Sequence, residues 1–226
     1  MSGVSSVRSV RVAVVGSRSL PPSLVGLVAP FVAAVVASGA AVVSSCCVGA
    51  DRLVVLAALR LLPAASLPRR LVVFAAFGPG GAGSSSAVSA VAAVLRAARR
   101  GACVRWACGP APRVPFRVRL FRRALALVGF VAAGAPGSCL VAVLASPSSR
   151  GSLRSCALAA RAGVPVGALC AFSGPPLPVL SGSGLWSRVP CLPLPAGVSA
   201  WRWCRVAPAQ LALPWSEAWP EDVSSW

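Results

Sequence analysis

The chain has 226 residues, of which 57% are hydrophobic, and this supply of apolar side chains is ample for one domain of ordinary size with an appended segment. Lys, His, Tyr, Asn, Thr and Ile are absent, so the formal charge of +18 comes from 22 arginines against four acidic residues. The lack of His and Lys and the scarcity of carboxylates argue against most acid–base enzymes and most metal centres.

Two explanations of the basic charge stay open. All six absent residue types have an adenine in the first or second codon position, so an adenine-poor gene would produce an arginine-rich surface without any function. Arginine also pairs bidentately with phosphate and stacks on bases, which favours nucleic acid over an acidic protein as a partner.

The apolar runs predict an alternation of strands and helices. We expect strands at residues 12–15, 41–44, 71–76, 102–106, 139–144 and 166–170, and helices at residues 24–37, 51–61, 87–99, 116–132 and 152–162. This rhythm predicts an α/β fold, a Rossmann-like parallel sheet with right-handed crossovers and helices on both faces. Ligands of such sheets bind at the carboxyl ends of the strands.

The first predicted strand ends in a turn at Gly16, Ser17 and Arg18. Residues 12–15 have the continuous apolar character of a strand that is covered on both faces, and Gly16 tolerates backbone geometry that a Cβ would forbid. Ser17 and Arg18 offer donors where the chain leaves the sheet. The turn therefore predicts a site for a phosphate-bearing ligand.

A second turn of small residues follows the strand at residues 41–44. Within it, Ser45, Gly49 and Asp51 are candidate site residues, and Asp51 is the only acidic residue before position 217. Asp51 is suited either to cap the next helix or to orient a loop. The loop at residues 77–86 is rich in Gly and Ser, which is typical of a flexible connection.

Arginines surround the start of the fourth predicted helix. Arg119 and Arg122 share a face of this helix, an arrangement that an anion between them would stabilise, although a solvated face is the alternative. The fifth predicted helix follows Ser149, Gly151 and Ser152. Ser149 or Ser152 can cap it while free amides face an anion.

The composition changes at residue 175, where prolines become frequent, and six of the seven tryptophans lie between residues 186 and 226. Trp201 and Trp203 alternate with Arg202 and Arg205, which suits base stacking beside phosphate contacts. The alternative is a poorly ordered extension whose tryptophans pack back on the core. We therefore divide the chain into a Rossmann-like domain, residues 1–174, and a Pro/Trp-rich extension, residues 175–226.

Nine cysteines occur without a Cys-x-x-Cys pair, and most lie in apolar segments, where cysteine behaves as a small hydrophobe. We expect no metal, no cofactor and a reducing, cytoplasmic location. Uncharged stretches at residues 19–50 and 124–149 are interrupted by Gly- and Pro-containing turns, so we expect no membrane insertion. The amino terminus shows no signal-peptide pattern.

Taken in order, the turns within residues 10–174 resemble the DNA-processing protein A (DprA/Smf) family and the SLOG nucleotide-binding domains, which share a Rossmann-like superfamily. The residues 16–18 look like the family's Gly-Ser-Arg signature. The residues 45–51 are similar to its Ser-Gly-x-Ala-x-Gly-Ile-Asp segment, with Cys46 where glycine is usual.

Two later motifs extend the resemblance. Phe116-x-x-Arg119 with Arg122 resembles the family's Phe-x-x-Arg-Asn region without its Asn, and the residues 149–153 look like its Ser-Gly-Ser-Leu helix start. The usual His of the second helix is absent, and no winged-helix pattern follows residue 175.

The resemblance implies that single-stranded DNA or a nucleotide binds at the strand ends, with backbone amides and Arg18, Arg119 and Arg122 meeting phosphate, in DNA processing or recombination. A homodimer is a further option. A SLOG-type sensor of a small nucleotide is one alternative. A nucleotide phosphoribohydrolase-like enzyme is the other, and we disfavour it because Asp51 is the only titratable candidate for acid–base catalysis in the domain.

Overall fold

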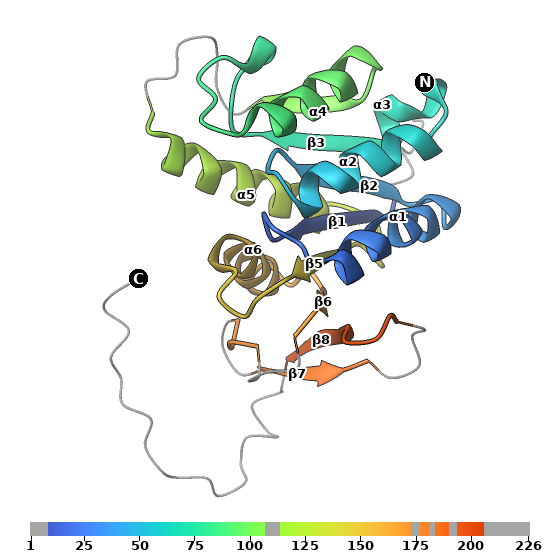
Figure 1. Cartoon of the computed structure of the whole chain (residues 1–226), viewed down its shortest axis with the longest axis vertical. Helices are drawn as coiled ribbons and strands as arrows, with labels where there is room; N and C mark the ends of the chain where they lie inside the picture. The colour runs from blue at the N-terminus through green and yellow to red at the C-terminus, as the bar shows by residue number, and fades with distance from the viewer. Residues whose placement is uncertain (1–8, 107–113, 173–176, 181–183, 190–193, 206–226) are drawn as a thin grey trace, which may run out of the picture.

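The structure is a computed structural model that describes residues 9–106, 114–172, 177–180, 184–189 and 194–205 (Figure 1). Its strands are β1 (Arg11–Gly16), β2 (Ala41–Ser45), β3 (Leu71–Ala75), β4 (Cys103–Trp106), β5 (Cys139–Leu144), β6 (Val166–Cys170), β7 (Gly184–Arg188) and β8 (Ser199–Arg205). Its α-helices are α1 (Pro22–Ala37), α2 (Ala50–Leu61), α3 (Leu67–Arg70), α4 (Val88–Arg99), α5 (Phe116–Ala132) and α6 (Arg150–Arg161).

The eight strands of the described residues form one sheet in the order β4-β3-β2-β1-β5-β6-β8-β7. Strands β1 to β6 pair in parallel, and β1 lies between β2 and β5. The chain first winds outward from β1 to β4 and then returns through α5 to β5 on the other side of β1. This reversal places a crevice at the carboxyl ends of β1 and β5, where ligands of doubly wound sheets bind.

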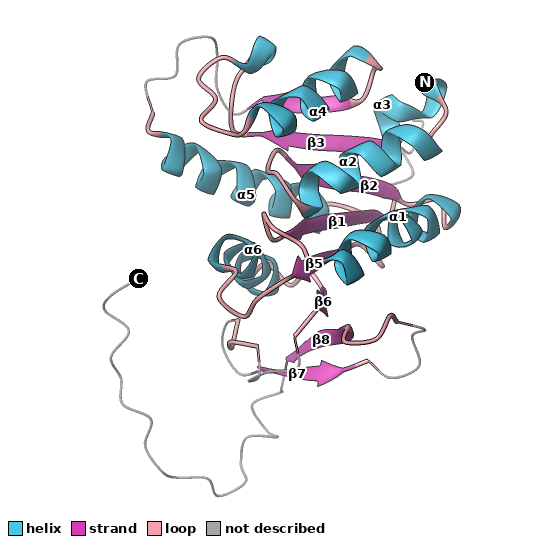
Figure 2. Ribbon diagram, in the orientation of Figure 1, coloured by secondary structure: helices cyan, strands magenta, loops and turns pink. Residues whose placement is uncertain are grey.

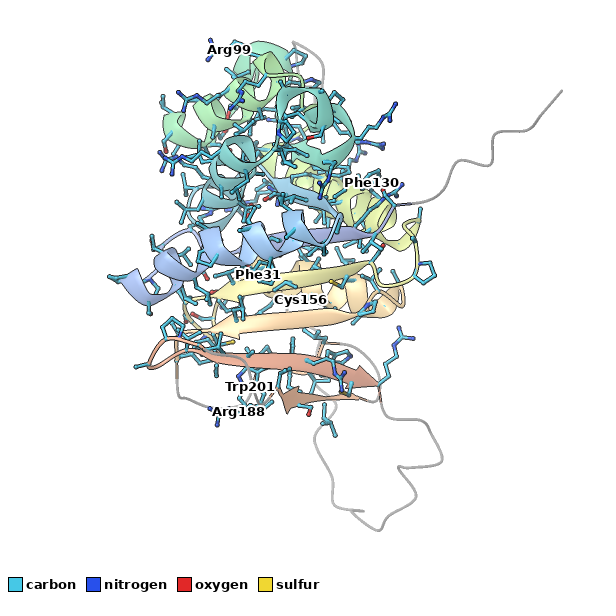
Figure 3. All side chains as sticks on the ribbon, turned by 90° about the vertical axis from the view of Figure 1, so that its right-hand side faces the viewer. Phe31, Arg99, Phe130, Cys156, Arg188 and Trp201 are labelled. Carbon is cyan, nitrogen blue, oxygen red and sulfur yellow. The ribbon has the colours of Figure 1, made fainter. Side chains whose placement is uncertain are left out.

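Helices cover both faces of the sheet (Figure 2). One core contains Leu24 of α1 and Val54 of α2 with side chains from α4, and the other contains Leu127 of α5 and Ala159 of α6. Figure 3 shows α1 in front of the strands and Cys156 of α6 behind them. Burial on both faces explains why the strands are continuously apolar.

The predicted fold class is confirmed. Each strand and helix that we predicted up to residue 170 is present, with ends that differ by at most two residues. The short helix α3 was not predicted, because its four residues include Pro68 and lead directly into a strand, so they carry no helical period. Among the described residues, no helix has the length and hydropathy needed to cross a bilayer.

The sheet continues beyond residue 174 through a hairpin that the sequence did not indicate. Strand β8 pairs antiparallel with both β6 and β7. Trp203 is buried in the second core, its ring centroid 5.6 Å from that of Trp186, whereas Arg202 is exposed. The alternation of tryptophan with arginine is therefore that of a half-buried strand. The division at residue 174 stays a prediction, and Trp215, Trp219 and Trp226 lie outside the described residues.

Candidate functional site

Three loops meet at the carboxyl ends of β1, β2 and β5, and Ser17 connects them. The Ser17 amide donates to Val143 O (2.9 Å), and the Ala50 amide donates to Ser17 O (3.1 Å). The Ser17 hydroxyl lies 2.7 Å from Ser149 Oγ and accepts the Ala145 amide at 3.0 Å. The loops are therefore held to one another by hydrogen bonds that the Ser17 backbone and side chain supply.

Two glycines permit this close approach. A Cβ on Gly16 would lie 2.5 Å from both Ala50 Cβ and Val143 O. Gly49 has φ +76°, and a Cβ on it would lie 2.2 Å from Ser17 O. Their part in the site is thus to let three backbones pack where any side chain would collide.

Asp51 lies beneath the loops and is only 2% exposed. Its Oδ1 accepts the Gly16 amide at 3.0 Å, and its Oδ2 accepts the Ser45 hydroxyl and, at 3.4 Å, the Cys47 amide. Helix α2 has no side-chain cap at its start. The sequence left open whether Asp51 caps the helix or orients a loop, and the structure shows that it orients the loops.

The pKa of Asp51 is raised from 3.8 to about 7, mainly because burial disfavours the charged form, although nearby Arg123 opposes the shift. Through this group the native state binds more protons than the unfolded state between about pH 4 and 6, and the free energy of unfolding should fall as pH rises through this range. Denaturant unfolding at about pH 4.5, 5.2 and 6 measures this slope. Asp51→Asn should flatten it, and an unchanged slope in that variant would assign it to another group.

The loops surround a pocket of about 860 Å³, within the range of ligand sites, about 300–1,000 Å³. The predicted residues that line it come from all three loops: Gly16, Ser17, Arg18, Ser45, Asp51, Ser149, Gly151 and Ser152. The arginines that line it come from the first loop and from α5 and α6: Arg18, Arg117, Arg123, Arg150 and Arg154. Five cations thus face one buried carboxyl, which makes the pocket suited to an anion.

The structure places three of the predicted residues outside the pocket lining. Gly49 supports the loops from behind, as its contact with Ser17 shows. Arg119 is 5% exposed, and its guanidinium donates to Val114 O (3.0 Å) and Ala76 O (2.8 Å). Arg122 is on the exposed side of α5. The resemblance gave both arginines a phosphate contact, and their positions do not bring them to this pocket.

Residues that we did not select line the pocket instead, namely Arg117, Arg123, Arg150 and Arg154, together with Phe121. A signal for Arg123 was present, because it lies next to the buried stripe of α5 that continues through Leu127. The sequence held no comparable signal for Arg154, whose guanidinium lies 4.2 Å from the centre of the Phe121 ring across two helices.

The helix starts add to the electrostatics of the pocket. Arg117 is in the first turn of α5 and Arg150 is the first residue of α6, and neither helix has an acidic residue in its first turn. Cations at the positive end of a helix dipole are unfavourable, and a bound anion would relieve both the dipole and the arginines. The described residues include no group of three or more His, Cys, Asp or Glu that could hold a metal.

Solved structures with a similar fold include two forms of DNA processing protein A, although no protein-family model and no curated protein sequence matches the chain. DNA processing protein A from Helicobacter pylori, described for its single-stranded DNA binding mode, is 15% identical with a TM-score of 0.53, over 70% of this chain and 64% of that one. DprA from Streptococcus pneumoniae is 19% identical with a TM-score of 0.52, over 70% of this chain and 49% of that one. The chain thus spans less than two thirds of either protein, and a DprA-like fold is confirmed.

Proposed function

We propose that this chain, which has the fold of DNA processing protein A, binds single-stranded DNA through phosphate contacts in the pocket at the ends of β1, β2 and β5. The observation that carries the proposal is the convergence of five arginines and two helix starts on one crevice. Arginine forks and helix amides both recognise phosphate oxygens. The DNA binding for which the H. pylori protein is described supports the same choice of ligand.

Apolar groups in the pocket favour a nucleic acid over a simple phosphate. Phe121 and Leu120 line it, and the guanidinium of Arg154 lies over the Phe121 ring. An aromatic ring beside phosphate-binding arginines provides a stacking surface for a base, and such stacking tolerates any sequence. We therefore propose binding without strong sequence preference.

The same pocket is poorly equipped for hydrolysis. The chain contains neither His nor Lys, and the Asp51 carboxyl is already the acceptor for three donors of the loops. A general acid or base has to reach the proton that it transfers, and Asp51 is buried beneath the loops. A role in recombination, a homodimer and a cytoplasmic location stay predictions.

A salt titration with a fluorescent oligothymidylate tests this function. Three to five phosphate contacts should give a linear fall of log affinity with log salt, with a slope of about −2 to −3.5. Tight binding of a mononucleotide with a flat salt response to the oligonucleotide would contradict DNA binding and favour a nucleotide sensor.

Two arginines of α5 provide a matched pair of variants. Arg117 lines the pocket and Arg122 is exposed elsewhere on the helix, so Arg117→Ala and Arg122→Ala change the net charge equally. Arg117→Ala should weaken binding about 3- to 10-fold and reduce the salt slope by about one contact. Arg122→Ala should leave the slope unchanged. Equal losses would show that the charge of the whole chain, and not this pocket, attracts DNA.

A further inference from the structure

Two adjacent cysteines, Cys46 and Cys47, lie at the floor of the pocket. In the family that the chain resembles, glycine is usual at the first of these two positions. Cys47 is half-buried and lines the pocket, whereas Cys46 behind it is 1% exposed. Nη1 of Arg123 lies 3.2 Å from Cys47 Sγ and 3.5 Å from Cys46 Sγ. One guanidinium nitrogen therefore contacts both sulfurs, so both cysteine side chains point toward Arg123.

The surroundings of this pair stabilise one thiolate. A hydrogen bond from the Cys47 thiol lowers the pKa of Cys46 to about 6 against the effect of burial, and Arg123 and the Ala76 amide, 3.2 Å from Cys46 Sγ, lower it further. The same hydrogen bond and burial raise the pKa of Cys47. At neutral pH the pair thus shares a single proton, and it holds the thiolate that thiol chemistry requires.

We propose that Cys46 and Cys47 form a reactive dithiol that a peroxide converts to a disulfide at the floor of the pocket. Arg123 favours this chemistry over capture of a metal cation, because its positive charge stabilises a thiolate and repels a cation. By contrast, burial is the main cause that raises the pKa of Cys156 and Cys170 to about 12, and no arginine opposes it, which keeps both as unreactive thiols.

The reaction balances with hydrogen peroxide as the oxidant. The thiolate of the pair attacks one peroxide oxygen, so that an S–O bond forms, the O–O bond breaks and hydroxide leaves. The thiol proton of the other cysteine neutralises this hydroxide to water. The sulfur of that cysteine then attacks the oxidised sulfur, forming the S–S bond and expelling the sulfenic oxygen as hydroxide. Two sulfurs are oxidised, and both peroxide oxygens are reduced.

Oxidation also changes the charge that Arg123 meets. In the reduced pair, the Cys46 thiolate offsets part of the Arg123 charge, whereas a disulfide is neutral and a poor hydrogen-bond acceptor. The disulfide would therefore leave the guanidinium available to an anion in the pocket. This consequence rests on the proposed function, and it predicts tighter phosphate binding by the oxidised chain.

Graded hydrogen peroxide followed by alkylation and peptide mass spectrometry tests the dithiol in the full chain. We expect the peptide with both cysteines to lose two hydrogens and then to resist alkylation. The rate of this oxidation should be at least about tenfold higher than the rate at which Cys103 or Cys204 is oxidised. Both comparison thiols are also half-buried. Cys103→Ser should leave the reaction unchanged, and Cys46→Ser should abolish the two-hydrogen loss. Equal rates of oxidation for the cysteine pair, Cys103 and Cys204 would overturn the proposal. A disulfide between Cys47 and a cysteine other than Cys46 would also overturn it.

Oligothymidylate binding by the reduced and oxidised chain tests the coupling. We expect affinity to rise about 3- to 10-fold on oxidation in the wild type and to stay constant in Cys46→Ser/Cys47→Ser. Loss of two hydrogens with unchanged affinity would support the dithiol and overturn the coupling. If neither form binds DNA, the proposed function fails, while the mass measurement still decides the dithiol.

Discussion

Gly49→Ala is expected to lower the free energy of unfolding by about 4 kcal/mol or to prevent folding. The residue has φ +76° and ψ −128°, a combination that side chains rarely adopt. In addition, a Cβ would lie 2.2 Å from Ser17 O and 2.4 Å from Arg18 O. These are backbone atoms, and moving them would break the hydrogen bond from the Ala50 amide to Ser17 O. The substitution therefore adds a collision to the backbone strain.

Gly39 provides a control that separates these two costs. It has φ +81°, but no atom lies within 4 Å of the Cβ that alanine would add. Gly39→Ala should therefore cost only the backbone strain, about 1–2 kcal/mol. Urea unfolding followed by circular dichroism measures both variants. Equal losses at the two positions would mean that the collision of the new Cβ with Ser17 O and Arg18 O adds no cost to the backbone strain.

Asp51→Ala is the second large effect, with an expected loss of about 3 kcal/mol at pH 7. The alanine leaves the Gly16 amide, the Ser45 hydroxyl and the Cys47 amide without their acceptor in a buried place. Because these donors belong to the first two loops, oligothymidylate affinity should fall in parallel. Chemical denaturation and the binding titration above measure the two consequences.

Asp51→Asn distinguishes the acceptor role of Asp51 from its charge. The amide keeps one oxygen that can accept the Gly16 amide, so the expected loss is smaller, about 1 kcal/mol. Burial already disfavours the carboxylate, as its raised pKa shows, and removing the charge offsets part of the lost bonding. A loss for Asn as large as that for Ala would indicate that the negative charge, and not the hydrogen bonds, holds the loops.

Parts of the candidate site could be predicted because they depend on local geometry. Gly16 and Gly49 occur where the backbone must turn beside another strand end, and Ser149 precedes a helix that starts there. Parallel strands place such turns at one edge of the sheet whatever the details of packing. Asp51 was recognisable as the one acid in the domain, but its role was not, because a cap and a loop anchor require the same residue type.

The choice among the arginines depended on the tertiary structure. Arg119, Arg122 and Arg123 lie within five residues of one helix, and the rotation of α5 against the sheet decides that the first is buried, the second exposed and the third in the pocket. That rotation is set by contacts of Leu127 and its neighbours with distant strands, which the periodicity of one helix does not specify.

The sequence by itself determined the order of strands and helices, the small-residue turns and the likeness to the DprA fold, since each depends on short-range patterns of apolar residues, glycine and proline. Only the tertiary structure decided which cations share a pocket and that Cys46 and Cys47 meet Arg123, 76 residues away from Cys47. It also decided that β7 and β8 extend the sheet, because β8 pairs with β6. These outcomes depend on contacts between segments far apart in the chain.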